Sequence, residues 1–320
     1  MKRKEKSPVI FHCPQMENLA KAVITRSGVY ALAKGIIDWN IFPDGSLDAV
    51  IGGREKRSGY IASMVRGRDV VFLASFDSPA DIQNQMLVIY QLARHEAHSL
   101  KIILPYFPGT MDREDQEGRV VNAVGYMDQL ANIPLQRGPA IVITFDLHVP
   151  HELFYLGHNA RCRALSALPL LKGQRALLLS QENHTAVAFP DDGAYKRFAH
   201  LMEPLHKIIC YKKRNRDARK VVIVEGDPKD QHVIIVDDII MTGATMLECK
   251  NVLLEAGAAS VSLFASHGIF PQESWKKFID AGFKHIWITD SCPESAGAVR
   301  GQKPFEVLSL ASLIAHAITE

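Results

Sequence analysis

The sequence predicts an α/β protein of two domains, each a mostly parallel sheet flanked by helices. Three observations support this prediction. Short apolar runs rich in β-branched residues alternate with amphipathic stretches, which is the pattern of parallel strands joined by helical crossovers. The chain has 320 residues, whereas one domain usually contains roughly 100 to 200. Hydrophobic residues make up 47% of the composition, so two buried cores can form.

The expected strands are short, apolar segments rich in Val, Ile and Phe. They are Val70–Phe76, Leu100–Leu104, Ile141–Phe145, Thr185–Phe189, Val233–Val236, Ser260–Ser266 and His285–Thr289. The expected helices lie between them and carry apolar residues three or four positions apart. They are Ala80–Glu96, Asp115–Ile133, Gly193–Leu205 and Ala244–Ala256.

The two series of strands are separated near Arg161, in the stretch LGHNARCRA. The first domain is therefore expected to span residues 1–160 and the second residues 161–303. The last segment, 304–320, contains apolar residues at helical spacing from Glu306 to Thr319. We expect this closing helix to pack back on the first domain.

Composition and charge exclude several classes of protein. The formal net charge is +2 and the acidic and basic residues are interspersed, which argues against a nucleic acid or a membrane as partner. The five cysteines lie far apart without a Cys-x-x-Cys pair, so free thiols in a reducing compartment are expected. No run approaches the roughly 18 apolar residues of a membrane span. The MKRKEK start precedes no hydrophobic signal core, so we expect a cytoplasmic protein that binds small molecules. A weak import signal in the early lysines is the alternative.

The segment 232–248, HVIIVDDIIMTGATMLE, places a group of polar atoms after an expected strand. Two carboxylates, Asp237 and Asp238, precede a turn. That turn contains Thr242, Gly243, Ala244 and Thr245. Because it opens a helix, its backbone N–H groups and hydroxyls form a nest for phosphate. The carboxylates suit the vicinal hydroxyls of a sugar or a bridging Mg²⁺. A sugar 5-phosphate satisfies both halves, and an ordinary strand–turn–helix junction with capping Asp residues is the alternative.

Two other expected strands end in metal-binding side-chain types. In TFDLHVPHELF, His148 follows Asp146 by two positions, so in an extended strand both point to one side and can share a metal. In FPDDGAYKRF, Asp191 and Asp192 open an expected helix. Ligands gather at the carboxyl ends of strands in open α/β sheets, so Asp191 and His148 are expected to meet across the domain cleft. A structural histidine and simple helix capping are the alternatives.

A cationic stretch, YKKRNRDARK at 211–220, contains Lys212 and Arg214. Such a charge run is usually a solvated surface. Its position between two strands of the expected sugar-phosphate domain suggests a mobile loop that closes over a negatively charged group and stabilises it during phosphoryl transfer.

Long collinear motifs resemble the ribose-phosphate diphosphokinases, also called phosphoribosyl pyrophosphate synthetases, and most closely the plant-type class II enzymes. The motifs are ASFDSPADI (74–82), LPYFPGTMDREDQEG (104–118), ITFDLH (143–148), FPDDGAYKRF (189–198), VEGD (224–227), VIIVDDIIMTGAT (233–245), SHGIFPQESWKKF (266–278), ITDSCP (288–293) and PFEVLSLA (304–311). They cover most of the chain.

This resemblance implies two phosphoribosyltransferase-like domains with the active site between them. It implies transfer of the diphosphoryl group of MgATP to the 1-hydroxyl of ribose 5-phosphate, which gives phosphoribosyl pyrophosphate and AMP. The residues that match the family's sites are Asp237, Asp238, Thr242, Gly243, Ala244 and Thr245 for ribose 5-phosphate, His148 and Asp191 for Mg²⁺, Lys212 and Arg214 for catalysis, and Phe42, Asp44 and Gly45 for the nucleotide. The nucleotide-binding segment of the family reaches across from a neighbouring subunit, so a homo-oligomer is implied.

Departures from the family pattern affect particular contacts. Met241 stands where phosphoribosyltransferases carry an acid, which counts against a base-transferring enzyme because a thioether is a weak acceptor. Ser46 stands where class I enzymes carry Glu, and Thr110 with Met111 occupies the region where they carry an Arg-Gln pair that contacts ATP. A relaxed choice of diphosphoryl donor is therefore left open. Likeness to class II implies activity without added phosphate. A non-catalytic regulatory homologue and a phosphoribosyltransferase are the alternatives.

Overall fold

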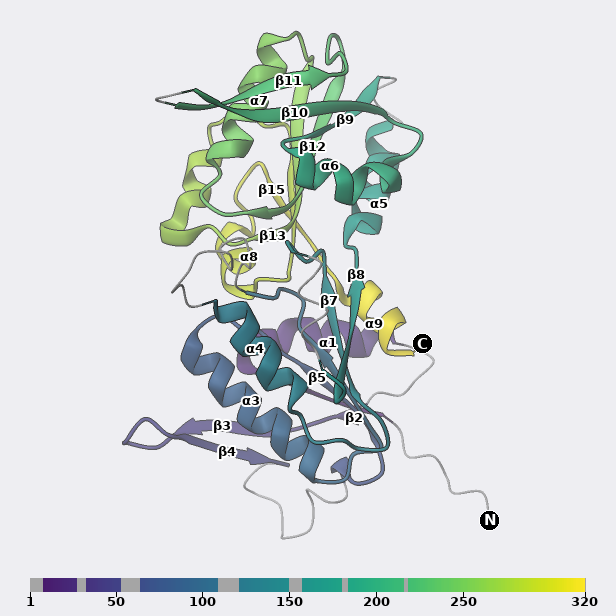
Figure 1. Cartoon of the computed structure of the whole chain (residues 1–320), viewed down its shortest axis with the longest axis vertical. Helices are drawn as coiled ribbons and strands as arrows, with labels where there is room; N and C mark the ends of the chain where they lie inside the picture. Colours follow the sequence, from purple (N-terminus) through teal and green to yellow (C-terminus); the bar gives the residue numbers. More distant parts are fainter. Residues whose placement is uncertain are drawn as a thin grey trace. The chain divides into compact units, whose positions relative to one another are not determined.

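The structure is a computed structural model that describes residues 8–27, 33–52, 64–108, 121–149, 157–179, 184–215 and 218–319. The chain divides into two compact units (Figure 1). Unit 1 contains Met1–Leu165 and Leu310–Glu320, and unit 2 contains Ser166–Ser309. No helix in the described ranges has the length and hydropathy needed to cross a membrane.

Unit 1 is built on a parallel sheet whose described strands have the order β2-β1-β5-β6-β7-β8. The strands are β1 (Val9–His12), β2 (Ala33–Lys34), β5 (Asp69–Leu73), β6 (Ser99–Ile103), β7 (Ala140–Phe145) and β8 (Ala160–Leu165). A separate antiparallel hairpin joins β3 (Ile37–Ile41) to β4 (Leu47–Ile51). Its tip points away from the parallel sheet (Figure 1).

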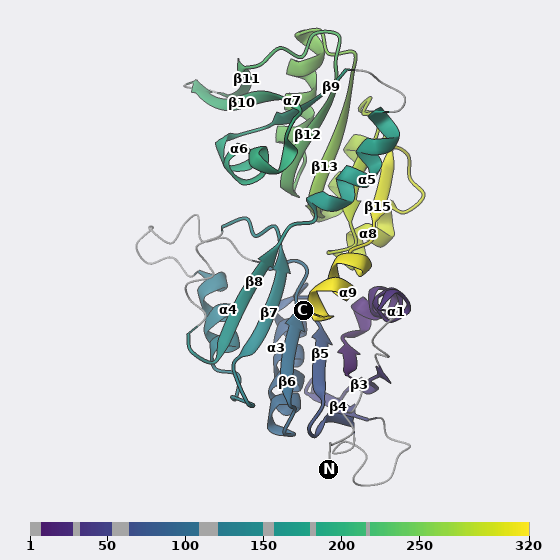
Figure 2. The same ribbon diagram turned by 90° about the vertical axis from the view of Figure 1, so that its right-hand side faces the viewer.

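Helices cover both faces of this sheet, with α4 and α1 on opposite sides (Figure 2). They are α1 (Glu17–Arg26), preceded by the 3-10 turn η1 (Pro14–Met16), α3 (Pro79–Arg94), α4 (Asn122–Ala131) and α9 (Ala311–Thr319). Helix α9, from the end of the chain, packs on α1. Two cations of the sheet cap its last carbonyls, because Lys101 Nζ donates to Ile318 O at 2.8 Å and Arg163 Nη1 to Ala317 O at 3.4 Å.

Unit 2 has a mixed sheet whose described strands have the order β11-β10-β9-β12-β13-β14-β15. The strands are β9 (Thr185–Phe189), β10 (His206–Asn215), β11 (Ala218–Glu225), β12 (His232–Ile240), β13 (Ser260–Gly268), β14 (Ile286–Thr289) and β15 (Phe305–Leu308). All neighbours are parallel except β10 and β11, which form an antiparallel hairpin at one edge of the described sheet.

The helices of unit 2 lie before and between its strands in the chain. They are α5 (Leu168–Leu179), α6 (Asp192–Phe198) with η3 (Ala199–Met202), α7 (Ala244–Glu255), η4 (Pro271–Phe278) and α8 (Pro293–Val299). From β9 the chain crosses through α6 to β10, and from adjacent β12 it crosses through α7 in the other direction to β13. In open α/β sheets this switch point is where ligands bind, beyond the carboxyl ends of the strands.

The structure differs from the sequence prediction at several boundaries. Residues Ala160–Leu165 form β8, which pairs with β7, so unit 1 extends to Leu165 rather than 160. Residues Phe305–Leu308 form β15 of unit 2, so the closing helix begins at Ala311 rather than Glu306. The helix predicted from Asp115 begins at Asn122 in the described residues, and 109–120 lie outside them.

Candidate active site

An acid pair lies in the last part of β12, next to the switch point. The strand continues to Ile240, so Asp237 and Asp238 are strand residues rather than turn residues. Both are buried, with 8% and 2% of their surface exposed, and the Asp238 N–H donates to Asp237 Oδ1 at 2.9 Å. Two carboxylates held in a buried strand need cations, protons or hydroxyl donors to compensate them.

Arg197 compensates one of the two carboxylates. It lies in the last turn of α6, and its Nη1 is 2.6 Å from Asp238 Oδ1. Its guanidinium also lies over the ring of Phe198, 5.7 Å from the centroid. The sequence analysis did not select Arg197, because its partner is distant in sequence and basic residues near helix ends are common. The available signal was that Arg197 lies close in sequence to Asp191, within the helix that Asp191 caps.

The other carboxylate has a strongly perturbed pKa. Burial raises the pKa of Asp237 well above its ordinary value, and the charges of Asp238 and Asp191 raise it further. These three acids therefore share one electrostatic site around the ends of β9 and β12. A group with excess negative charge of this kind favours ligands that bring hydroxyl protons or a cation.

The turn after β12 exposes a helix N-terminus. Gly243 has φ +81° and is the N-cap of α7, so no side chain occupies the position that Ser or Asp usually fills. A Cβ on Gly243 would lie 2.3 Å from two ring carbons of Phe278. Ser274 holds the turn by donating to Met241 O at 3.2 Å. Thr242 and Ala244 are exposed and Thr245 is half-buried, so α7 begins at an exposed turn, and the first N–H groups of a helix at such a turn can bind an anion.

Asp191 acts as a helix cap in the structure. Its Oδ1 accepts from Ala194 N at 3.1 Å, at the start of α6. The neighbouring Asp192 pairs with Lys196 at 2.5 Å. Capping, one of the two roles expected from the sequence, is therefore present. The charge of Asp191 still acts on Asp237, so the cap also belongs to the acid site.

The basic stretch was expected to be a loop, and most of it is strand. Lys212 and Arg214 lie in β10, where their backbone pairs with Val221 and Arg219 of β11. The structure describes the backbone of these two residues and not their side chains. Residues 216–217 lie outside the described residues. The antiparallel pairing explains the difference, because an edge strand needs no apolar periodicity to satisfy its backbone.

His148 belongs to unit 1 and follows β7. The strand ends at Phe145, and Asp146 has φ +37°, so the chain is not extended between Asp146 and His148. The predicted alternation therefore does not hold: Asp146 is buried and His148 is exposed. His148 and Asp191 lie in different units, and their meeting stays a prediction.

The predicted nucleotide-binding residues form the tip of the β3–β4 hairpin. Gly45 has φ +85°, and its N–H donates to Phe42 O at 2.9 Å. Ser46 donates to Asp44 Oδ1 through its hydroxyl at 2.6 Å and its N–H at 2.9 Å, and these bonds lower the pKa of Asp44. The Phe42 side chain is half exposed. Thr110 and Met111 lie outside the described residues.

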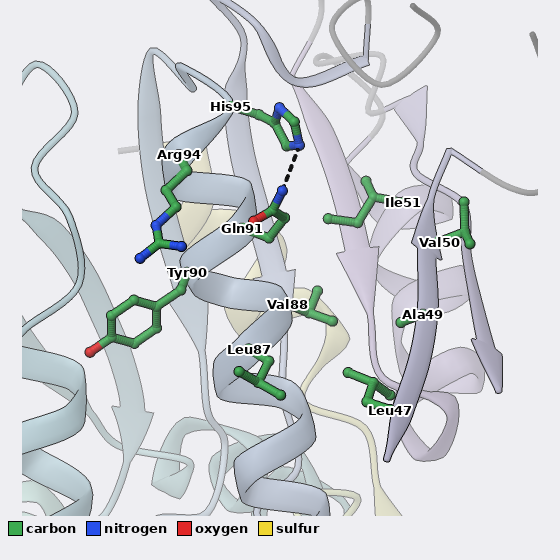
Figure 3. A pocket seen from close by; sticks show the side chains of 10 residues that line it. All are labelled: Leu47, Ala49, Val50, Ile51, Leu87, Val88, Tyr90, Gln91, Arg94 and His95. Carbon is green, nitrogen blue, oxygen red and sulfur yellow. Dashed lines mark hydrogen bonds between the residues drawn. The ribbon is translucent and has the colours of Figure 1, made fainter. Parts of the chain in front are cut away.

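A hollow of about 440 Å³ lies elsewhere in unit 1, between β4 and α3 (Figure 3). It is lined by Leu47, Ala49, Val50, Ile51, Leu87, Val88, Tyr90, Gln91, Arg94 and His95. Its walls are mainly aliphatic, and Gln91 Nε2 and His95 Nε2 lie 3.1 Å apart at one end. None of the predicted site residues lines it.

Unit 2 brings together two kinds of polar group. The acids at the ends of β9 and β12 offer oxygen atoms, and the N-terminus of α7 offers N–H donors. Oxygen donors suit Mg²⁺, which usually takes one or two carboxylates and completes its shell with water and substrate phosphate. Within the described ranges no three His, Cys, Asp or Glu side chains form a ready-made metal site.

Comparison with known proteins identifies relatives over nearly the whole chain. The phosphoribosyl transferase domain family matches residues 178–293. The chain is 42% identical to ribose-phosphate pyrophosphokinase 3, chloroplastic, of Oryza sativa, over 98% of this chain and 76% of that protein. It is 42% identical to the mitochondrial pyrophosphokinase 3 of Spinacia oleracea, over 98% and 77%. Ribose-phosphate pyrophosphokinase 4 of Arabidopsis thaliana is 39% identical, over 97% and 91%.

A solved structure supports the fold. Phosphoribosylpyrophosphate synthetase from Mycobacterium smegmatis superposes with a TM-score of 0.78 at 24% identity, covering 98% of both chains. The predicted α/β class, with mostly parallel sheets flanked by helices, is therefore confirmed.

Proposed function

The chain belongs to the ribose-phosphate pyrophosphokinase family, and from this premise we propose how its own residues perform the reaction. The enzyme transfers a diphosphoryl group from MgATP to the 1-hydroxyl of ribose 5-phosphate, which gives phosphoribosyl pyrophosphate and AMP. The supporting observation is the juxtaposition, at one switch point, of a buried acid pair and an uncapped helix N-terminus.

Ribose 5-phosphate is proposed to bind with its phosphate at the turn Thr242, Gly243, Ala244 and Thr245. The N-cap position of Gly243 supports this placement, because no capping side chain competes with a phosphate for the first N–H groups of α7. Asp237 and Asp238 accept hydrogen bonds from the ribose 2- and 3-hydroxyls. The raised pKa of Asp237 suits this role, since a hydroxyl donor stabilises the carboxylate charge that burial disfavours.

Mg²⁺ is proposed to be held by Asp191 and His148 together with the phosphates of ATP. The carboxylate oxygen of Asp191 and the nearby negative charge fit such a cation, which prefers oxygen ligands, and exposed His148 can take part through a metal-bound water. When bound, Mg²⁺ neutralises phosphate charge and orients the diphosphoryl group for in-line attack.

Lys212 and Arg214 are proposed to stabilise the diphosphoryl group during transfer. Their strand, β10, pairs with β9, whose end carries Asp191. Cationic side chains near this edge supply charge that the acids cannot, and phosphoryl transfer depends mainly on such positioning and charge. Loss of one such contact typically costs about 10²- to 10³-fold in rate.

The nucleotide is proposed to bind Phe42, Asp44 and Gly45 of a neighbouring subunit, in a homo-oligomer. The exposed aromatic ring at the hairpin tip, beside Ile41 with 56% of its surface exposed, supports contact with another molecule. We also propose a cytoplasmic location, which the five free thiols support, and activity without added phosphate.

The test is AMP formation from ATP and Mg²⁺, with and without ribose 5-phosphate. We expect sugar-dependent AMP from the wild type and a loss of at least about 10²-fold in Lys212→Ala. Lys229→Ala, an exposed lysine after β11 in the same unit, is the matched control and should retain activity. Folded wild-type protein that forms no AMP, even with other nucleotides and added phosphate, would point to a regulatory homologue.

A further inference from the structure

Two buried cysteines of unit 2 face one another across the interface of a strand and a helix. Cys249 Sγ donates to Cys210 Sγ over 3.7 Å. Cys210 lies in β10 and Cys249 in α7, and neither exposes measurable surface. A disulfide bond is about 2.05 Å long, so the two sulfurs need to approach by roughly 1.7 Å to form one.

The two elements joined by this contact carry the proposed site. Two residues after Cys210, β10 reaches Lys212, and Cys249 lies in the helix that begins at the phosphate turn. Helix α7 is also fastened to the β10–β11 hairpin where Val221 N donates to Glu248 Oε1 at 2.7 Å. A change at the sulfurs therefore acts on both elements together.

The local backbone permits the approach. The register of the β10–β11 pair shifts between Ile209 and Cys210, as in a β-bulge. Bulges redirect side chains and weaken the ladder locally. Because the hairpin stands at the edge of the described sheet, local opening there also gives a small oxidant access to the buried thiols.

We propose that Cys210 and Cys249 form a reversible modification site, at which a peroxide oxidises the two thiols to an intrachain disulfide that lowers the enzyme's activity. The disulfide itself does not depend on the proposed function. Its effect on activity rests on the assignment of Lys212 and the phosphate turn under Proposed function.

The chemistry balances with hydrogen peroxide as the oxidant. The Cys210 sulfur attacks one oxygen, the O–O bond breaks, and a sulfenic acid and one water form. The Cys249 sulfur then attacks the sulfenic sulfur and releases a second water. Two electrons pass from the sulfurs to the peroxide, and both thiol protons leave in water. The hydrogen bond from Cys249 lowers the pKa of Cys210, which agrees with Cys210 as the attacking thiol.

The disulfide is expected to disturb the site rather than to unfold the unit. Closing the sulfur gap pulls β10 toward α7 and moves Lys212 relative to the N–H groups at the start of the helix. A misplacement of about 1 Å in such a site can cost on the order of 10²-fold in rate. A dithiol reductant restores the enzyme, whereas it does not reverse methionine oxidation.

The experiment compares reduced full-length enzyme with enzyme treated with hydrogen peroxide, followed by mass spectrometry of unreduced peptides and by the AMP assay. We expect a peptide pair containing Cys210 and Cys249, about 2 Da lighter than the two thiol peptides. We also expect a loss of at least tenfold in activity, reversed by dithiothreitol. Cys249→Ala should lack both the crosslink and the reversible loss, while Cys162→Ala, which changes the partly exposed cysteine of β8, should retain both.

Each outcome decides a separate statement. Oxidised wild type without the Cys210–Cys249 peptide pair overturns the modification site, and this result needs no variant to fold. A peptide pair with unchanged activity overturns the regulatory effect and leaves the site. A peptide pair in a protein that makes no AMP when reduced leaves the site and contradicts the proposed function.

Discussion

Single residues of the acid site are placed for binding at a cost in stability. The pKa of Asp237 is raised above its ordinary value of 3.8 by burial and by two neighbouring carboxylates. When the pKa of a carboxyl is higher in the folded than in the unfolded chain, its contribution to stability is fully present below the unfolded pKa. This contribution is lost as pH rises through the folded pKa. At neutral pH the carboxyl therefore contributes less to stability than it does in acid.

We expect Asp237→Asn to raise the melting temperature at pH 7 and to lower activity by about 10²-fold. The gain should shrink as the pH falls toward 4, because the wild-type carboxyl is then protonated. Differential scanning calorimetry over this pH range measures it. Asp280→Asn, at an exposed acid, is the control. A melting temperature for Asp237→Asn below wild type across the range would contradict the argument.

Gly243 combines a backbone requirement with a packing requirement. Its φ of +81° disfavours other residues, and a Cβ would meet the Phe278 ring at 2.3 Å. We expect Gly243→Ala to destabilise unit 2 by about 3 kcal/mol, with strain and overpacking both contributing. Urea unfolding measures this.

The matched control is Gly301→Ala, because Gly301 has φ +82° with open space around its Cβ position. This variant should cost only about 1 kcal/mol. Equal losses at the two positions would show that the Phe278 contact is unimportant.

At the scale of elements, α9 depends on cations from the sheet that it covers. Lys101 and Arg163 donate to its last carbonyls, which lie at the negative end of the helix. We expect Lys101→Met to speed amide hydrogen exchange in α9 by about tenfold, with smaller changes in unit 2. Lys172→Met, at an exposed lysine of α5, should leave α9 unchanged. Equal protection of α9 in both variants would show that the cap is not needed.

The elements that were predicted from the sequence are those whose pattern of apolar residues fits one type of element, either a strand or a helix. Apolar runs predicted β6, β7, β9 and β14 to within one residue at each end, whereas the segment predicted for β5 ran past Leu73 to Phe76 and that for β13 stopped at Ser266 instead of Gly268. The β3–β4 hairpin was missed because its side chains, apart from that of buried Ile51, are half-buried or exposed. The apolar spacing of residues 306–319 fits a helix, and tertiary pairing with β14 makes its first part a strand.

The candidate site was predictable only where its signal is local. The DD and TGAT segments adjoin in sequence, so their acids and helix N-terminus could be placed together. Arg197 lies on α6 and reaches Asp238 of β12, far from it in sequence. The positive φ of Asp146, which redirects the chain before His148, has no sequence signature of its own. Contacts between distant residues are set by packing, which composition and periodicity do not encode.

At the scale of the whole molecule, the proposed nucleotide site tests assembly directly. If Phe42 serves a neighbouring subunit, each active site combines Phe42 of one subunit with Lys212 of another. Phe42→Ala and Lys212→Ala then inactivate a site from different subunits. Mixing the two inactive proteins after subunit exchange should restore about a quarter of wild-type activity, since random pairing leaves that fraction of sites intact. Each protein alone is the control. Mixtures as inactive as their components would place both residues in one subunit.

The return of α9 to unit 1 has a consequence for synthesis on the ribosome. Unit 2 is one continuous stretch, Ser166–Ser309, inserted into unit 1 before its last helix. A nascent chain therefore presents a complete second unit while the first still lacks α9, and α1 stays uncovered on the side where α9 packs. Residues 311–319 have to be synthesised and released from the exit tunnel before the first unit can close. The part of the protein that emerges first is thus the part that matures last.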